Sequence, residues 1–286
     1  MNKLKIKVAP NAGFCFGVKR AIDLVEKILE NSQGPVFCWG ELIHNPIMMN
    51  RLKKKGLKVI DDLKDFKINS IFVIRSHGIT LEDLNLIKNK TNQIVDTTCP
   101  FVKKAQNWAK KFNEQGLKVV IIGDKNHIEV KGINSRADNQ AFIIDSALEL
   151  ENIKEKLSEK VGIVCQTTQK SSKLMKIIQK LKELKIDFEL QDTICLDSTQ
   201  KQKEVKEICD EPDLLIVIGG LNSSNTTKLA EIGKSKKIKT YHIEKAEDIL
   251  QKWFLKEDTV FLTAGASTPP DEVIKAKKIM ENFDFE

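Results

Sequence analysis

The chain has 286 residues, of which 41% are hydrophobic and 30% charged, so it is typical of a globular protein with room for two or three compact units. Its net charge of +7 comes from lysines spread over the whole chain, which favours a solvated surface over a nucleic-acid partner; the alternative is attraction for an acidic partner or a polyphosphate substrate. No apolar run could span a membrane and no N-terminal signal is visible, so we expect a cytoplasmic protein with no membrane partner.

The first third of the chain alternates short apolar strands with amphipathic helices. We expect strands over 4–8, 35–39, 70–75 and 93–95, and helices over 18–29, 46–54, 81–88 and 101–114. A proline opens the second of these helices, where its missing N–H costs nothing. The pattern predicts α/β units with mainly parallel sheets.

The rest of the chain repeats this alternation. We expect strands over 118–122, 141–144, 160–165, 188–191, 213–218, 239–243 and 259–263, and helices over 147–156, 171–184, 200–209, 227–235, 248–253 and 270–283. The predicted fold is therefore α/β, with three similar units. Their loops can face one another only if the units are arranged with pseudo-three-fold symmetry around a central site. The predicted boundaries are residues 14–97, residues 98–194, and residues 195–286 together with 1–13.

Three cysteines occupy the same kind of place in this pattern. Asp96-Thr97-Thr98-Cys99-Pro100 and Asp192-Thr193-Ile194-Cys195 each lie between a strand and a helix, and Gly13-Phe14-Cys15-Phe16-Gly17-Val18 is a looser version. A helix N-terminus favours a thiolate, and three thiolates are ligands for zinc or an iron–sulfur cluster. A cluster with three cysteines would leave one iron open to substrate. The other three cysteines lie inside apolar segments, and we interpret them as buried: Cys38, Cys165 and Cys209.

Polar residues that could bind an anion or move a proton follow the predicted strands. In parallel sheets ligands bind at the carboxyl ends of strands, where three of the four histidines lie. Imidazolium can hold a phosphate and a glutamate can pass a proton. The serine- and asparagine-rich segment before the helix at 227 is either a helix cap or an anion cradle. The candidates are His44, His77, His127, Glu129, Thr167, Ser223, Ser224, Asn225 and Ser267.

These phrases together resemble one family. Beside the cysteine phrases the chain carries Ile43-His44-Asn45, Ser76-His77-Gly78, His127-Ile128-Glu129-Val130, Gln166-Thr167-Thr168, Asn222-Ser223-Ser224-Asn225 and Ala264-Gly265-Ala266-Ser267. In this order, over nearly the whole chain, they resemble the 4-hydroxy-3-methylbut-2-enyl diphosphate reductase family, which completes the methylerythritol phosphate route to isoprenoids.

The resemblance implies a mechanism and a set of roles. It implies a [4Fe-4S] cluster held by Cys15, Cys99 and Cys195, which removes the substrate hydroxyl as water with two electrons and two protons. Isopentenyl and dimethylallyl diphosphates are the implied products, and a ferredoxin or flavodoxin is the implied electron donor. We expect a monomer or a weak dimer. The implied substrate contacts are His44, His77, His127, Thr167, Ser223, Ser224, Asn225 and Ser267, and the implied catalytic residues are Glu129, Thr167 and His127.

Two other functions remain open at this point. The main alternative is a zinc-dependent hydrolase of a phosphorylated metabolite, with cysteine and histidine ligands. The other is a basic RNA-binding protein without catalytic activity.

Overall fold

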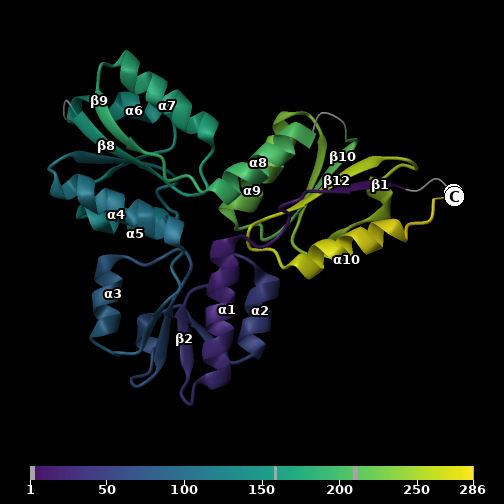
Figure 1. Cartoon of the computed structure of the whole chain (residues 1–286), viewed down its shortest axis with the longest axis horizontal. Coiled ribbons are helices and arrows are strands. Elements are labelled where there is room, and N and C mark those ends of the chain that lie inside the picture. The colour runs from purple at the N-terminus through teal and green to yellow at the C-terminus, as the bar shows by residue number, and fades with distance from the viewer. Residues whose placement is uncertain (1–3, 158–159, 209–211, 286) are drawn as a thin grey trace. The chain divides into compact units, whose positions relative to one another are not determined.

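The computed structural model describes residues 4–157, 160–208 and 212–285. Within these residues the chain forms three four-stranded parallel sheets flanked by helices (Figure 1). The α/β class with parallel sheets, predicted from the alternation of apolar strands and amphipathic helices, is therefore confirmed.

Sheet 1 is built from the first part of the chain. Its strands are β2 (Val36–Trp39), β3 (Leu57–Ile60), β4 (Ile71–Ile74) and β5 (Ile94–Asp96), in the spatial order β3-β2-β4-β5. The helices of this part of the chain are α1 (Phe16–Asn31), α2 (Pro46–Lys54) and α3 (Leu81–Lys88).

Sheet 2 has the same plan. Its strands are β6 (Lys118–Ile122), β7 (Phe142–Ile144), β8 (Lys160–Cys165) and β9 (Asp187–Gln191), in the order β7-β6-β8-β9. Its helices are α4 (Pro100–Glu114), α5 (Ile128–Asn134), α6 (Ala147–Ile153) and α7 (Ser171–Glu183).

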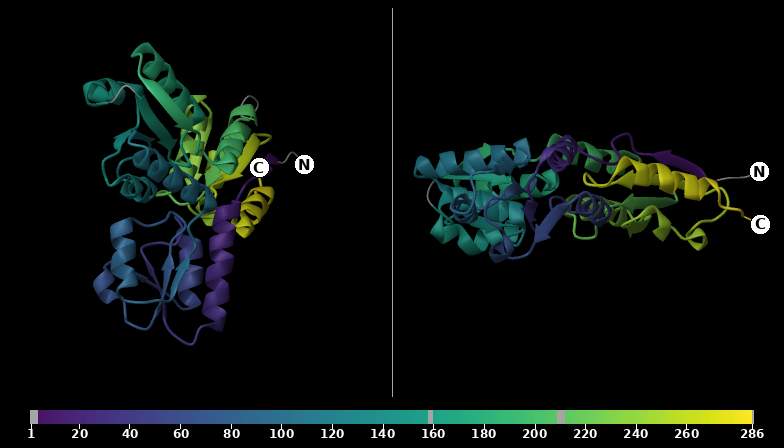
Figure 2. Two further views of the ribbon diagram at one scale, coloured as in Figure 1. Left: turned by 60° about the vertical axis from the view of Figure 1, so that its left-hand side comes forward. Right: turned by 90° about the horizontal axis from the view of Figure 1, so that it is seen from below.

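Sheet 3 joins the two ends of the chain. Its strands are β10 (Leu214–Ile218), β11 (Lys239–Ile243), β12 (Thr259–Ala264) and β1 (Lys5–Val8), in the order β11-β10-β12-β1. Its helices are α8 (Leu196–Ile208), α9 (Ser224–Ser235) and α10 (Pro270–Glu281). Figure 2 shows α10 running along this sheet, where Val273, Ala276 and Met280 pack against the buried residues of β10 and β12.

All three sheets share one topology once β1 is counted as the fourth strand of sheet 3. In each, the second strand lies outside the first, the third pairs with the first, and the fourth lies outside the third. The chain therefore reverses its winding direction between the first and third strands. Ligands of open parallel sheets bind beyond the carboxyl ends of the two strands at such a switch point.

The core of sheet 2 shows how alternating residues of a strand pack against helices on both faces of the sheet. On β6, Val119 and Ile121 pack with α4 and α5, whereas Val120 and Ile122 pack with α6 and α7 on the opposite face (Figure 1). In α4 the buried residues Val102, Ala105, Ala109 and Phe112 recur at helical spacing. A Cβ added to Gly162 of β8 would lie 2.3 Å from Phe112, so glycine is required beneath this ring.

Three local predictions differ from the structure. β3 was not expected, because it is a short edge strand directly after a helix and only Leu57 and Ile60 are buried. α5 was expected as part of a loop, because it has 7 residues and includes a glycine. The helix predicted over 248–253 is instead two short 3₁₀ turns, Ala246–Asp248 and Gln251–Trp253.

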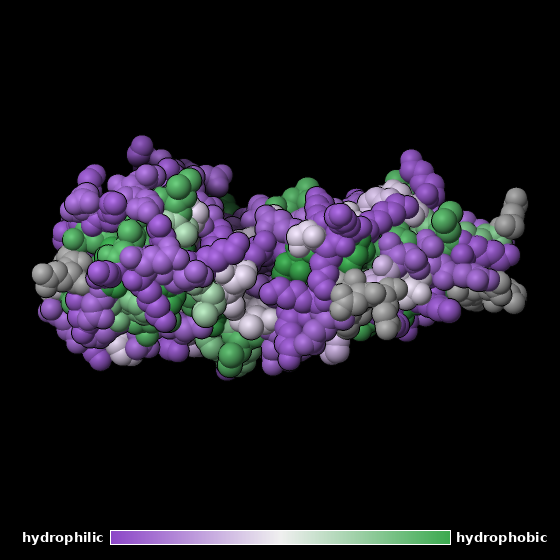
Figure 3. Space-filling view, turned by 90° about the horizontal axis from the view of Figure 1, so that it is seen from above, coloured by the Kyte–Doolittle hydropathy of each residue, from purple (hydrophilic) through white to green (hydrophobic). Residues whose placement is uncertain are grey.

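The chain divides into two compact units, each described by itself below. Unit 1 comprises Met1–Lys19, Ile43–Lys54 and Leu196–Glu286, and unit 2 comprises Arg20–Leu42 and Lys55–Cys195. The predicted boundaries at 13/14, 97/98 and 194/195 stay predictions. Among the described residues no helix is both long and apolar enough to cross a membrane. On the face seen in Figure 3, hydrophilic side chains separate small groups of apolar ones.

Candidate functional site

Each of the three predicted cysteine ligands comes directly before a helix: Cys15 before α1, Cys99 before α4 and Cys195 before α8. Each backbone N–H donates to a carbonyl two residues beyond the end of the neighbouring strand. The acceptors are Ala266 beyond β12 at 3.0 Å, Ser76 beyond β4 at 2.9 Å and Thr167 beyond β8 at 2.8 Å. The three cysteines therefore occupy equivalent positions, each after the fourth strand of its sheet.

The repeated Asp-Thr-x-Cys phrase is explained by hydrogen bonds. The Asp96 carboxylate accepts the N–H of Thr98 at 2.9 Å, which closes an Asx turn before Cys99. The Thr97 hydroxyl donates to the Ile74 carbonyl at 2.5 Å.

The second copy of the phrase makes the same bonds. Asp192 accepts the N–H of Ile194 at 3.0 Å, and the Thr193 hydroxyl donates to the Cys165 carbonyl at 2.6 Å. Aspartate and threonine thus fix the turn that presents each cysteine.

The helix starts place backbone donors beside the sulfurs. The N–H of Val18 lies 3.4 Å from the Cys15 Sγ and donates to it. Burial raises the pKa of the Cys99 thiol, and backbone N–H groups of Phe101 and Val102 act in the opposite direction. Cys195, which belongs to the same unit, adds a smaller electrostatic contribution that also raises this pKa.

The other cysteines behave as predicted where they are described. Cys38 and Cys165 are buried, and burial raises the pKa of each thiol to about 12. Such thiols are inert. Cys209 lies outside the described residues.

Within unit 2, His77 and His127 are brought together with a carboxylate. Their ring centroids are 5.9 Å apart in an edge-to-face arrangement. His127 is the N-cap of α5, and its Nδ1 accepts the N–H of Glu129 at 3.2 Å. In a neutral imidazole this leaves Nε2 as the protonated nitrogen.

The Glu129 carboxylate is held at both oxygens by one residue. Its Oε1 accepts the N–H of Thr167 at 2.6 Å, and its Oε2 accepts the Thr167 hydroxyl at 3.0 Å. Only 2% of Glu129 is exposed. Because the Cys195 N–H donates to the Thr167 carbonyl, this residue connects a carboxylate to a cysteine turn.

A second group of predicted residues lies within unit 1. Ser223 is the N-cap of α9, and Asn225 in its first turn accepts a hydrogen bond from Ser198 at 3.2 Å. The Ser267 hydroxyl donates to the His44 carbonyl at 2.9 Å. A Cβ added to Gly220 would lie 2.7 Å from that carbonyl, so the segment before Ser223 also approaches it. Ser224 accepts a hydrogen bond from Lys228 at 3.2 Å.

Several buried polar atoms of this group have unmet hydrogen-bonding capacity. Asn45 Nδ2, Asn225 Nδ2 and Thr226 Oγ1 are buried and have no hydrogen-bond partner among the described residues. Buried polar atoms are normally satisfied, so such a cluster indicates a polar ligand or ordered water. If the Ser-Asn segment were only a helix cap, this would explain Ser223 but not the buried Nδ2 of Asn225.

The structure divides the predicted site residues between the two units. Unit 1 holds Cys15, His44, Ser223, Ser224, Asn225 and Ser267, and unit 2 holds His77, Cys99, His127, Glu129, Thr167 and Cys195. Within the described residues no group of three or more His, Cys, Asp or Glu side chains is arranged to hold a metal ion. The three-cysteine ligand set therefore stays a prediction.

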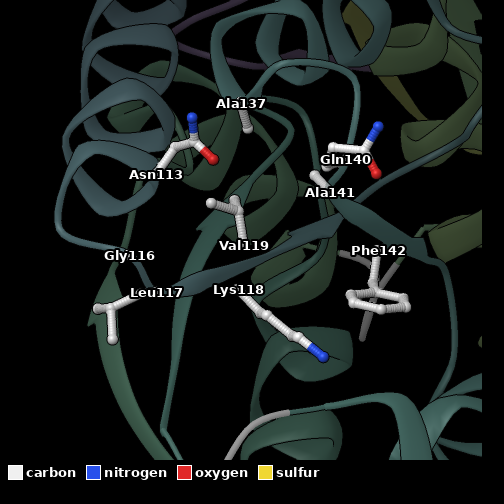
Figure 4. Close-up of a pocket in the computed structure, with 9 residues that line it drawn as sticks. All are labelled: Asn113, Gly116, Leu117, Lys118, Val119, Ala137, Gln140, Ala141 and Phe142. Atoms are coloured by element: carbon white, nitrogen blue, oxygen red, sulfur yellow. The ribbon is translucent and has the colours of Figure 1, made fainter.

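A cavity of about 350 Å³ in unit 2 lies elsewhere (Figure 4). It is lined by residues at the amino ends of β6 and β7, including Lys118, Gln140 and Phe142, and by Asn113 of α4. The predicted residues of sheet 2 follow the carboxyl ends of its strands, so this cavity is not part of the candidate site.

Sequence reasoning missed two residues that support the site. Arg20 directs its guanidinium toward the carbonyls of Thr97 and Thr98, at 3.5 and 3.4 Å, just before Cys99. Gln106 is buried in α4 although it is polar. Arg20 lies two residues after the Cys15 phrase, which was a usable signal, whereas Gln106 resembles any polar residue on a helix.

Fold and residue placement define the class: an α/β protein in which, within each unit, candidate thiols, imidazoles and hydroxyls follow the carboxyl ends of parallel strands. The sequence model of the LytB protein family matches residues 6–281, and the chain belongs to this family. It is an oxidoreductase, as its relatives are.

Two relatives of known identity match along nearly their whole lengths. The 4-hydroxy-3-methylbut-2-enyl diphosphate reductase of Campylobacter hominis is 41% identical over 267 residues, covering 93% of this chain and 94% of the relative. The enzyme of the same name from Geobacter sulfurreducens is 40% identical over 285 residues, covering 98% of this chain and 99% of the relative.

Two solved structures that resemble this chain are also of this reductase. A structure of (E)-4-hydroxy-3-methyl-but-2-enyl diphosphate reductase, the terminal enzyme of the non-mevalonate pathway, is 37% identical, with a TM-score of 0.72 over 98% of this chain and 100% of that one. The structure of E-1-hydroxy-2-methyl-but-2-enyl-4-diphosphate reductase from Plasmodium falciparum is 30% identical, with a TM-score of 0.89. The match covers 97% of this chain and 87% of that one.

Proposed function

We propose that this oxidoreductase converts 4-hydroxy-3-methylbut-2-enyl diphosphate to isopentenyl and dimethylallyl diphosphates. The substrate C–O bond breaks, two electrons and one proton reach the allyl carbon skeleton, and a second proton leaves with the hydroxyl as water. The observation that carries the proposal is the placement of the binding residues. His44, His77, His127, Thr167, Ser267 and the Ser223–Asn225 segment all follow the first or third strand of a sheet, the two strands at each switch point.

Cys15, Cys99 and Cys195 would hold a [4Fe-4S] cluster, which when bound supplies electrons and a Lewis acid for the leaving hydroxyl. The donor set fits such a group in two respects. All three thiols precede helix starts, and backbone N–H groups point at the sulfurs of Cys15 and Cys99. Burial raises the pKa of the partly buried Cys99 thiol, so a bound cation would be needed to keep it as a thiolate.

Each of the two groups of side chains offers contacts for a diphosphate. The imidazoles of His77 and His127 offer N–H donors, and in unit 1 Asn225 Nδ2 offers a buried donor without a hydrogen-bond partner among the described residues. His44, Ser223, Ser224 and Ser267 complete the predicted contacts. Hydrogen-bonding groups positioned before the ligand arrives stabilise it without reorganisation.

Proton delivery would fall to Glu129 with Thr167 and His127. The carboxylate is buried and fixed at both oxygens by Thr167, so it keeps one orientation. The Thr167 hydroxyl, already bonded to Glu129, can rotate between the carboxylate and the substrate hydroxyl and so relay a proton. His127 fixes the first turn of the helix that carries Glu129.

Metal analysis of protein purified without oxygen tests the proposal. We expect a brown protein with iron and sulfide near four each per chain, and turnover with a chemical reductant. A Cys195→Ser variant should lose the cluster, while Cys38→Ser, at a buried thiol outside the site, should keep it. A colourless protein with one zinc would favour the hydrolase instead. A ferredoxin or flavodoxin donor, a monomer or weak dimer, and a cytoplasmic location remain part of this proposal.

A further inference from the structure

The polar residue Gln106 lies on the buried face of α4, seven residues after Cys99. Only 5% of it is exposed, and its Nε2 is buried with no hydrogen-bond partner among the described residues. An unsatisfied buried amide is destabilising, so its presence requires an explanation.

The amide of Gln106 lies between two segments that carry site residues. A Cβ added to Gly78 would lie 2.6 Å from its Nε2, and a Cβ added to Gly132 would lie 3.1 Å from the same atom. Gly78 follows His77 directly, and Gly132 lies one helical turn after Glu129 in α5. One amide thus touches the backbone beside both functional side chains.

The Ile79 carbonyl is the candidate acceptor for this amide. Its oxygen would lie 3.5 Å from a Cβ on Gly132, the same position that lies 3.1 Å from Nε2, and it already accepts a long hydrogen bond from Arg136 at 3.5 Å. A shift of the turn at 77–79 could bring this carbonyl to Nε2. Gly78 in this turn has a φ of 82°, a conformation that glycine adopts freely.

We propose that Gln106 is a positioning residue that places the His77 turn against the helix of Glu129, and that its amide becomes hydrogen-bonded when a diphosphate engages His77 and His127. This positioning role rests on the proposed function only because it takes a diphosphate as the ligand. Ligand binding then relieves the cost of the buried amide, so part of the binding free energy depends on Gln106.

Two substitutions by side chains of similar size distinguish a positioning role of Gln106 from a packing role. Gln106→Met removes both polar atoms, and Gln106→Glu keeps the shape but removes the N–H donor. Gln115→Met, at the exposed C-cap of the same helix, is the matched control.

The experiment measures the binding of inorganic pyrophosphate to the anaerobically purified protein by calorimetry, together with the thermal midpoint without ligand. We expect Gln106→Met to keep or raise the midpoint and to weaken pyrophosphate binding roughly three- to tenfold, the effect of one lost hydrogen bond. Gln106→Glu should weaken it at least as much, and in turnover both variants should raise KM for the allylic diphosphate with iron content unchanged. Gln115→Met should change neither quantity.

Unchanged pyrophosphate affinity in both Gln106 variants would overturn the proposal, whatever their thermal midpoints. A lowered midpoint with unchanged affinity would identify Gln106 as a packing residue and would also overturn it. Pyrophosphate binding that depends on Gln106 in a protein without reductase activity would support the positioning role and reject the proposed reaction.

Discussion

Thr167 links two parts of the candidate site, because its amide and hydroxyl bond to one carboxylate and its carbonyl bonds to a cysteine turn. The amide and hydroxyl hold Glu129, and the carbonyl accepts the N–H of Cys195. A carboxylate fixed in this way cannot turn away from the site without breaking two hydrogen bonds. This fixed orientation, rather than exposure, is what supports the proposed role of Glu129 as a proton donor.

Replacing Glu129 by glutamine tests this role. The amide oxygen can still accept from Thr167, so we expect a folded protein with unchanged iron content, but the carboxyl proton is lost and kcat should fall by about 10²- to 10⁴-fold. The measurement is single-turnover reduction under anaerobic conditions. Glu114→Gln, at the exposed end of α4, is the control, and near-normal turnover of the Glu129 variant would reject the role.

The Asp96 carboxyl group in the turn before Cys99 should make the stability of the protein depend on pH. Burial works to raise the pKa of Asp96, but hydrogen bonds from Lys103 and Thr98 outweigh it and lower the pKa from its ordinary value of 3.8. The stabilisation is therefore present above the unfolded-state pKa and is lost as the pH falls through the lower folded-state pKa.

The Asp96→Asn variant should show this dependence. It keeps an acceptor for Thr98 but loses the ion pair with Lys103, so it should be less stable than the wild type at pH 7, by an amount that shrinks as the pH falls below 3.8 and through the lower folded-state pKa. Thermal unfolding across this range is the measurement, with the exposed Asp65→Asn as control. A difference that persists unchanged in acid would contradict the assignment.

Residues with a specific chemistry were the predictable ones. Cys15, Cys99 and Cys195 could be placed before helices because each lies where an apolar run gives way to a helical pattern. The contacts that position them come from segments distant in sequence, as the Ser76 carbonyl does for Cys99. Gln106 could not be found at all, because its burial follows from packing between two glycines.

At the scale of elements, the fourth strand of each sheet has one function: it ends at a cysteine turn and a helix. Because that turn bonds to the loop after the third strand, each sheet can present its cysteine and its binding residues at the same edge. The alternation of strands and helices was predictable from apolar patterns. β3 and α5 were not, since a 4-residue edge strand and a 7-residue helix are too short to show a period.

Close packing of two binding segments in unit 1 gives an element-scale prediction. A Cβ added to Gly265 would lie 1.9 Å from the Oγ1 and 3.0 Å from the Cβ of Thr226 in α9. Gly265→Ala should therefore push the segment of Ser267 away from the start of α9, at a cost of about 1–3 kcal/mol in the free energy of unfolding. Chemical denaturation measures this cost.

Two further variants check the cause. In Gly34→Ala the added Cβ meets only the Asn69 carbonyl at 3.8 Å, so its stability should hardly change. Thr226→Ala combined with Gly265→Ala should recover part of the lost stability, because the side chain in the way is shortened. A double variant no more stable than Gly265→Ala would show that the methyl group acts in another way.

At the scale of the whole molecule, three sheets of one topology use the two ends of the chain to complete the third. β1 pairs with β12, so sheet 3 requires residues from both ends of the sequence. This closure could be anticipated from the three cysteine phrases. The strand orders could not, because they depend on which strands pair and leave no local trace in the sequence.

The net charge of +7 yields the last prediction. If the electron donor is an acidic protein such as a ferredoxin or flavodoxin, opposite charges accelerate its encounter with this chain, and added salt screens that attraction. Turnover with such a donor, at concentrations below saturation, should fall as salt is raised from 0.02 to about 0.3 M, where the Debye length is much shorter. Turnover with a small chemical reductant should change far less, because no protein surface has to dock. Equal salt dependence with both reductants would mean that the salt acts on the enzyme or its diphosphate substrate, and that the charge excess is only a solvated surface.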